Sequence, residues 1–356
     1  MLNAEHGGDI YNREIFYDFS ANLNPLGMPQ RVRDALLSDI STWEKYPDPF
    51  CRRLRTLLSE REQLPVEQIV CGNGAADLIY RIVQAVKPQH GIVCAPSFSE
   101  YEKALSQNGC CISRYYLSPE RCFVLDESIL EVLTADTDIL FLCSPNNPTG
   151  RTISGDLLQR IAETCLAQNI IFVCDECFLD FVRDGRSVRS CLNENVTILK
   201  AFTKIYAMAG LRLGYALFGS PSLAEMVRTT GQYWSVSAPA QLAGETALAE
   251  KAYLKKTLSL IEEEYKYLTE ALIGLGFTVY PSEANFILFR CSLPLDLLLL
   301  QEKILIRNCR NYEGLTEGFF RIAVRSHPEN TMLIEAIRRV INGKADHDSG
   351  NHVERR

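Results

Sequence analysis

The stretch NVTILKAFTKIYAMAGLRLGY, residues 195–215, starts as an apolar run and continues into a polar, glycine-bearing segment. The run at 195–202 is typical of a buried β-strand. Lys204 follows it among small and apolar neighbours, eight residues before Arg212. A lone lysine is usually a solvated surface charge, but burial lowers the pKa of an amine and favours its attack on an aldehyde. Lys204 is therefore a candidate nucleophile.

Similar apolar runs lie upstream and alternate with amphipathic helical patterns. They end at Gly72 and occupy residues 91–96, 137–145 and 169–176. This alternation is typical of βαβ units and predicts an α/β fold with a mainly parallel sheet flanked by helices. Ligands of such sheets bind beyond the carboxyl ends of the strands, so the polar residues at those ends are the candidates for function.

The pattern changes after about residue 227. A long amphipathic helix is expected up to Gly274, followed by strands and helices that suggest a small α+β domain. We therefore expect an N-terminal segment at 1–40, a large domain at 41–245 and a small C-terminal domain at 246–342 that follows a bridging helix. The polar end of the chain, 343–356, is expected to be a disordered tail.

Bulk composition narrows the class of protein. The 356 residues are 47% hydrophobic and 23% charged, and no apolar stretch is long enough to span a membrane. The net charge of −7 argues against general binding of nucleic acid. Because the N-terminus has no apolar signal region, we expect a cytoplasmic protein. The 13 cysteines are expected to be mostly buried thiols, and no metal site is expected.

Polar residues at other predicted strand ends point to a ligand. Asp175 ends the run IIFVCDE, where an unpaired buried carboxylate is costly; it is either an anion for a ligand or a structural cap or ion pair. Residues 72–76, GNGAA, precede a helical pattern and let backbone amides approach a phosphate. Residues 144–150, SPNNPTG, form a turn that presents Asn147. Either segment alone also fits an ordinary tight turn.

Phe98, in APSFSEY beyond another strand, completes the set because it can stack on an aromatic ring, although such a residue is usually part of the core. An amine, an anion, a phosphate cradle and a flat ring are what pyridoxal phosphate requires. The motifs SPNNPTG, FVCDE, and T-K followed by GLRLGY resemble, in this order, those of fold-type I pyridoxal-phosphate enzymes of the class I and II aminotransferase group. The resemblance covers residues 6–341 and implies an enzyme whose large domain binds this cofactor.

The resemblance also implies a role for each motif residue. Lys204 forms the Schiff base, Asp175 pairs with the pyridinium nitrogen, Asn147 donates to the phenolic oxygen, and Phe98 stacks on the ring. Tyr46, in KYPDP, resembles a tyrosine that reaches the cofactor phosphate in the neighbouring subunit, which implies a homodimer with shared active sites. The residues expected to hold the phosphate within the subunit are Gly74, Ala75, Ala76 and Arg212.

Several segments resemble one subgroup, the threonine-phosphate decarboxylases of cobalamin biosynthesis; they are HGGD (6–9), DFSANLNPLGMP (18–29), YWSVSAPAQ (233–241) and LIRNCRNYEGL (305–315). Histidinol-phosphate aminotransferases lack the first and last in this form. Cys177 and Phe178 stand where many aminotransferases have alanine and tyrosine, as in the decarboxylases. Ala201 stands where many relatives have a hydroxyl on the cofactor phosphate, and Thr203 is the expected substitute.

The subgroup implies a phosphorylated amino-acid substrate, O-phospho-L-threonine or O-phospho-L-serine, which is decarboxylated to an aminoalkyl phosphate. Arg321 is expected to bind the carboxylate, since a guanidinium fork matches it. The other expected substrate contacts are His6, Gly7, Asn22, Asn147 and Arg307. Arg307 also fits a surface ion pair, and Arg310 and Arg325 fit the pattern less closely. Two alternatives remain: a histidinol-phosphate type aminotransferase, and a catalytically silent binding protein with this fold.

Overall fold

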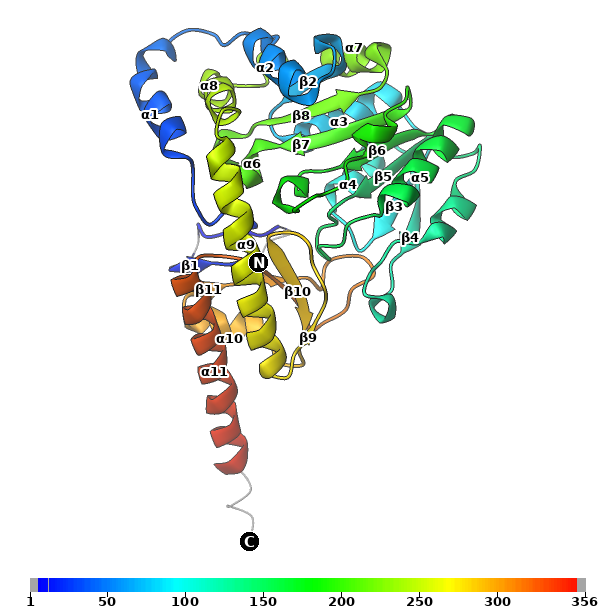
Figure 1. Ribbon diagram of the computed structural model, residues 1–356. Helices are drawn as coiled ribbons and strands as arrows, with labels where there is room; N and C mark the ends of the chain where they lie inside the picture. Colours follow the sequence, from blue (N-terminus) through cyan, green and yellow to red (C-terminus); the bar gives the residue numbers. More distant parts are fainter. Residues whose placement is uncertain (1–5, 12, 351–356) are drawn as a thin grey trace.

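The computed structural model describes residues 6–11 and 13–350 and shows a large mixed sheet with a smaller sheet beside it (Figure 1). The large sheet has seven strands, in the spatial order β2 (Ile69–Gly72), β8 (Gly214–Phe218), β7 (Val196–Ala201), β6 (Ile171–Asp175), β5 (Ile139–Cys143), β3 (His90–Ala95) and β4 (Cys111–Tyr116). Within this sheet, β8 runs in the direction opposite to that of the other six strands. The predicted α/β class and mainly parallel sheet are confirmed.

Alternate residues of these strands enter two separate cores. In β6, Val173 packs on one face, and Phe172 and Cys174 pack on the other. The first face is covered by α3 (Ala75–Val86), α4 (Glu100–Gln107) and α7 (Pro221–Thr229). The second is covered by α2 (Arg52–Glu62), α5 (Gly155–Ala167), α8 (Ala238–Ala247) and α9 (Lys251–Gly274). Burial on both faces explains why the strands read as continuous apolar runs.

The smaller sheet is antiparallel, in the order β12 (Arg307–Asn308), β13 (Phe319–Ala323), β10 (Phe286–Arg290) and β9 (Thr278–Val279). It packs with α9, α10 (Leu295–Gln301) and α11 (His327–Gly350). Near the N-terminus, β1 (Tyr17–Asp18) pairs in parallel with β11 (Ile304–Leu305), and α1 (Gln30–Ser38) packs on α8. The N-terminal segment therefore runs from β11, which directly precedes β12 of the small sheet, to α8, which covers one face of the large sheet. The domain boundaries given above stay a prediction.

Two features differ from the sequence-based expectation. The strands β4 and β8 were not predicted, because β4 is a largely exposed edge strand and β8 follows directly on the glycine-bearing GLRLG motif. Residues 343–350, expected to belong to a disordered tail, continue helix α11. Adding a residue to an existing helix gains a hydrogen bond without a new nucleation cost, so a polar end can extend it. Residues 351–356 of the expected tail lie outside the described residues.

Three further expectations concern the cysteines, metal sites and membrane-spanning helices. All thirteen cysteines are free thiols, and nine of them are buried. In the described part of the chain, no group of three or more His, Cys, Asp or Glu side chains is placed to hold a metal ion. In the same part of the chain, no helix has the length and apolarity that a transmembrane span needs.

Candidate active site

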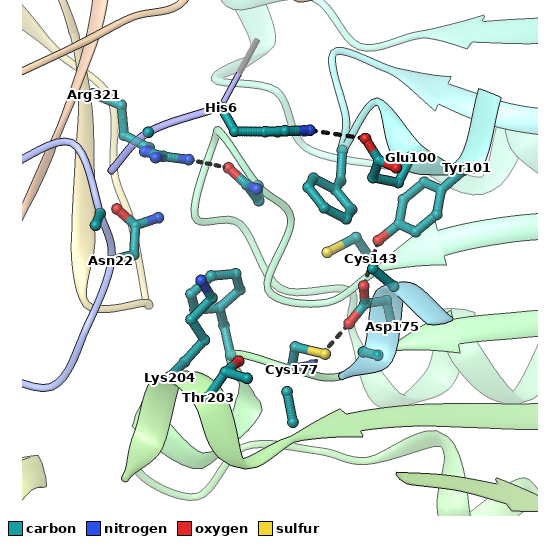
Figure 2. Close-up of a pocket in the computed structure, with 18 of the residues that line it drawn as sticks. His6, Asn22, Glu100, Tyr101, Cys143, Asp175, Cys177, Thr203, Lys204 and Arg321 are labelled. Carbon is teal, nitrogen blue, oxygen red and sulfur yellow. Dashed lines mark hydrogen bonds and ion pairs between the residues drawn. The ribbon is translucent and has the colours of Figure 1, made fainter. Parts of the chain in front are cut away.

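A cavity of about 570 Å³ opens beyond the carboxyl ends of β5, β6 and β7 (Figure 2). The strands contribute its floor, and the N-terminal segment and residues of the small sheet close it from the other side. Twelve of the predicted site residues line it; they are His6, Gly7, Asn22, Ala75, Ala76, Phe98, Asn147, Asp175, Thr203, Lys204, Arg212 and Arg321. Residues far apart in the sequence therefore meet at one strand-end cavity, as the topology of the sheet requires.

Lys204 lies in α6 (Phe202–Ile205), the short helix that follows β7. Its backbone is held on both sides, because Asn24 N–H donates to the Lys204 carbonyl at 3.1 Å and Phe202 N–H donates to the Leu213 carbonyl at 3.1 Å. The amine forms no hydrogen bond or ion pair with the described residues. Burial, aided by the charge of Arg321, lowers the pKa of Lys204 to about 8. The amine is thus poised to act as a nucleophile near neutral pH.

This lowered pKa predicts how the cofactor-free protein takes up an aldehyde. Only the neutral amine attacks, and its fraction grows as the pH rises through the pKa. We expect the rate of pyridoxal-phosphate incorporation, followed by visible absorbance, to rise with pH and to level off above about 8. A rate that keeps rising towards about 10.4, the pKa of an ordinary lysine, would contradict this expectation. Lys204→Ala serves as the blank.

Asp175 is the last residue of β6 and is only 4% exposed. Its carboxylate accepts a hydrogen bond from the Tyr101 hydroxyl at 2.6 Å and from Cys177 N–H at 2.9 Å. Burial, together with the neighbouring charge of Asp175, raises the pKa of Tyr101, which remains a donor. The two donors fix the carboxylate at the cavity wall (Figure 2). A carboxylate oxygen accepts more than one hydrogen bond, so Asp175 retains capacity for a protonated ring nitrogen.

A phosphate cradle lies at the N-terminus of α3. Gly74 is the N-cap with φ +84°, and a Cβ there would lie 2.7 Å from an Arg212 guanidinium nitrogen. No larger residue fits at Gly214 either, because a Cβ added there would lie 2.5 Å from Ala75 N. Gly74 therefore stands behind the lining formed by Ala75, Ala76 and Arg212. Free backbone amides at a helix start, with a guanidinium beside them, suit a phosphate group.

Asn147 and Arg321 form the opposite end of the cavity. The Asn147 side-chain oxygen accepts hydrogen bonds from Arg321 and from the Tyr312 hydroxyl, the latter at 3.3 Å. Both donors point to the same oxygen, so the amide nitrogen is left as a donor for a ligand. Arg321 also donates to the Ser20 carbonyl at 2.7 Å, while its buried Nε and the Asn22 side-chain oxygen have no partner among the described residues.

Three predicted residues lie outside the cavity lining. Gly74 supports the cradle from behind, as described above. Tyr46 is 80% exposed and stacks on Trp234 with ring centroids 4.6 Å apart. Arg307 is buried and lines a neighbouring cavity of about 140 Å³, and Tyr312 lines both cavities.

The two weaker candidates for a substrate contact lie elsewhere. Arg310 is exposed, and Arg325 pairs with Glu329 at 2.6 Å.

Several lining residues were missed by the sequence-based prediction, among them Ser20, Glu100, Tyr101, Lys103, Cys143 and Tyr312. Tyr101 has a recognisable signal, since it lies three residues after Phe98 on the buried face of a helix that reaches β6. Tyr312 has none, because its hydrogen bond to Asn147 joins residues 165 positions apart.

The residues present fit pyridoxal phosphate on this geometry: a buried amine of lowered pKa, a buried carboxylate and a helix-start cradle shaped by Gly74. Comparison with known proteins agrees. The model of the aminotransferase class I and II family matches residues 14–339. A threonine-phosphate decarboxylase of Salmonella typhimurium is 39% identical over an alignment of 362 positions, which covers 98% of this chain and 100% of that protein.

Solved structures give the same result. The histidinol-phosphate aminotransferase from Clostridium acetobutylicum has a TM-score of 0.85 at 28% identity, and the L-threonine-O-3-phosphate decarboxylase from Porphyromonas gingivalis has 0.83 at 26%. Each alignment covers 99% of the solved chain, and they cover 92% and 91% of this chain respectively. The chain therefore belongs to the aminotransferase class I and II family and is a pyridoxal-phosphate-dependent enzyme.

Proposed function

We propose that the protein decarboxylates O-phospho-L-threonine, or O-phospho-L-serine, to an aminoalkyl phosphate for cobalamin biosynthesis. The observation that carries this proposal is that His6 and Gly7, from the HGGD segment, line the same cavity as Arg321 and Lys204. The cavity thus has room for an amino acid with anionic groups at two places. The 39% identity to a threonine-phosphate decarboxylase over nearly the whole chain supports the same reaction.

The placement of the lining residues supports a set of proposed cofactor contacts. Lys204 would bind the aldehyde group and Asp175 would accept from the pyridine nitrogen. Phe98 would contact the ring, and Asn147 would donate to the phenolic oxygen. The residues that hold the phosphate are Ala75, Ala76, Thr203 and Arg212, with Gly74 shaping the turn. When bound, pyridoxal phosphate supplies an electron sink for the bond that breaks at Cα.

The substrate contacts decide which bond breaks. Arg321 has an unpartnered buried Nε and holds the carboxylate or orients it, while His6, Gly7 and Asn22 hold the side-chain phosphate. Decarboxylation would require these contacts to orient the substrate so that the bond from the carboxylate to Cα is the one that the bound cofactor weakens. Once the substrate amine has displaced Lys204 from the cofactor, the lysine ammonium would give one proton to Cα as carbon dioxide leaves, and the product would depart as the amine.

The proposed assembly is a homodimer with shared sites. Trp234 contacts both Tyr46 and Tyr233, and Phe50 contacts Tyr233; all four side chains are exposed. A monomer rarely exposes such a group of large aromatic side chains without a partner. In this assembly Tyr46 reaches the cofactor phosphate of the second subunit.

Arg307 is proposed to contribute to binding of the phosphate on the substrate side chain. It lies in the neighbouring cavity, behind Tyr312, which lines both cavities.

The reaction is tested by incubating the enzyme with O-phospho-L-threonine and measuring both carbon dioxide and amine. We expect the two products in equal amounts, with no requirement for a 2-oxo acid. The second candidate function is transamination of the histidinol-phosphate type, supported by the similarity to the Clostridium acetobutylicum structure. Turnover that depends on a 2-oxo acid and releases no carbon dioxide would favour that candidate and exclude decarboxylation.

A further inference from the structure

Two charged residues at one wall of the cavity, Glu100 and Lys103, have no part in the roles assigned above. Glu100, the first residue of α4, accepts a hydrogen bond from His6 Nε2 at 2.8 Å, from the Tyr80 hydroxyl at 2.8 Å and from Lys103 Nζ at 3.1 Å. His6, Glu100 and Lys103 all line the cavity. Figure 2 shows the His6 ring directed at Glu100, on the far side of the cavity from Lys204.

The presence of Glu100 requires an explanation, because a carboxylate at the wall of a cavity for an anionic ligand repels that ligand. The hydrogen bond from His6, with those from Tyr80 and Lys103, lowers the pKa of Glu100 to about 2. Glu100 is therefore an anion at every working pH and acts only as an acceptor. Its charge is offset locally by Lys103, and His6 donates a hydrogen bond to it.

The hydrogen bond from His6 Nε2 to Glu100 determines which ring nitrogen of His6 remains to bind a ligand. Nε2 carries the proton that Glu100 accepts, so Nδ1 is the ring nitrogen left for a ligand in the cavity. A phosphate oxygen is also an acceptor, and the ring serves both only by donating from each nitrogen. The ring face packs against Phe98 at a centroid distance of 5.6 Å, which limits its rotation.

We propose that Glu100 is a positioning residue that holds His6 as a donor for the side-chain phosphate and so makes the cavity discriminate phosphorylated from unphosphorylated amino acids. This inference rests on the proposed function, since it takes the substrate to be a phosphorylated amino acid. Glu100 acts through His6 and not by contact with the substrate. Lys103, one helical turn along α4, shares the same carboxylate oxygen and adds to the positive potential at this wall.

The test is Glu100→Gln, which keeps the size of the side chain and removes its charge. Dissociation constants for O-phospho-L-threonine and L-threonine are measured from the visible absorbance of the holoenzyme, and KM and kcat from carbon dioxide release. We expect the dissociation constant and the KM for O-phospho-L-threonine to rise about tenfold. The value of kcat and the dissociation constant for L-threonine should stay nearly unchanged.

The matched control is Glu245→Gln. The Glu245 side chain is 13% exposed against 14% for Glu100, has one arginine partner and lies outside the cavity.

A double-mutant cycle with His6→Ala separates positioning from a general structural effect. Because Glu100 is proposed to act through His6, the double variant should bind O-phospho-L-threonine no worse than His6→Ala alone. Three outcomes would overturn the inference. They are equal losses of affinity for the two ligands, additive losses of affinity in the cycle, and no loss of affinity in Glu100→Gln. If the wild type binds O-phospho-L-threonine but releases no carbon dioxide, the proposed function fails, while the dissociation constants still decide the role of Glu100. A wild type that does not bind this ligand refutes both.

Discussion

Lys204→Ala is expected to abolish the lysine-bound chromophore and to lower turnover by at least about 10³-fold. The variant removes the buried amine that binds the aldehyde and that returns the proton to Cα, and proton transfer by a positioned group alone contributes about 10² to 10⁴. Visible absorbance of the purified protein, its change with borohydride, and carbon dioxide release measure the effect. Mass analysis after borohydride treatment should place the cofactor on Lys204 in the wild type.

The control for this prediction is Lys103→Ala, which removes the other lysine of the cavity lining. Lys103 pairs with Glu100 at 3.1 Å, and its loss should leave the lysine-bound chromophore in place. A Lys204→Ala protein that still carries a borohydride-fixed cofactor would show that a different lysine binds it. The same measurement tests the catalytically silent alternative, because a silent binding protein predicts no lysine-bound chromophore in the wild type.

Asp175→Asn is expected to lower kcat by about 10² to 10³-fold at saturating cofactor, the cost of removing one preorganised electrostatic group from an active site. Asparagine keeps the size of the side chain, but it carries no charge to stabilise a protonated pyridine nitrogen. The cofactor then withdraws electrons less well from Cα. Steady-state kinetics with O-phospho-L-threonine, together with cofactor content, measure the two effects separately.

Tyr101→Phe is the comparison for this variant, since it removes one donor to the carboxylate and leaves the charge in place. A loss of about tenfold is the scale of one hydrogen bond to a charged group. If Asp175→Asn matched Tyr101→Phe, the carboxylate would matter only for local structure. If Asp175→Asn matched the wild type, its proposed contact with the ring nitrogen would be refuted.

The sequence alone predicts the architecture of the large sheet well, because each of its central strands leaves a local signal. Both faces of β3, β5, β6 and β7 are covered, so these strands appear as apolar runs between helical patterns. The edge strand β4 and the glycine-led β8 lack this signal. The course of α11 beyond residue 342 was also missed, because its polar composition favours disorder when it is considered without the preceding helix.

The predicted cofactor residues lie together because each lies at a strand end, and the strand ends could be predicted from the sequence. Asp175, Asn147 and Lys204 lie at or just beyond the carboxyl ends of parallel strands, and these ends share one edge of the sheet. Their chemical type and their distance from the strand end therefore specify the site. The location of Arg307 was less predictable, because it depends on how the small sheet packs against the large one.

By itself, the sequence thus determined the fold class, the cofactor and the order of the strand-end residues, since all three depend on local pattern and on type of side chain. Only the tertiary structure decided which residues orient them. Tyr101 reaches Asp175 from a helix on one face of the sheet, and Glu100 holds His6 across 94 positions of the chain. Such contacts depend on distance and direction between separate elements, for which no spacing in the sequence provides a signal.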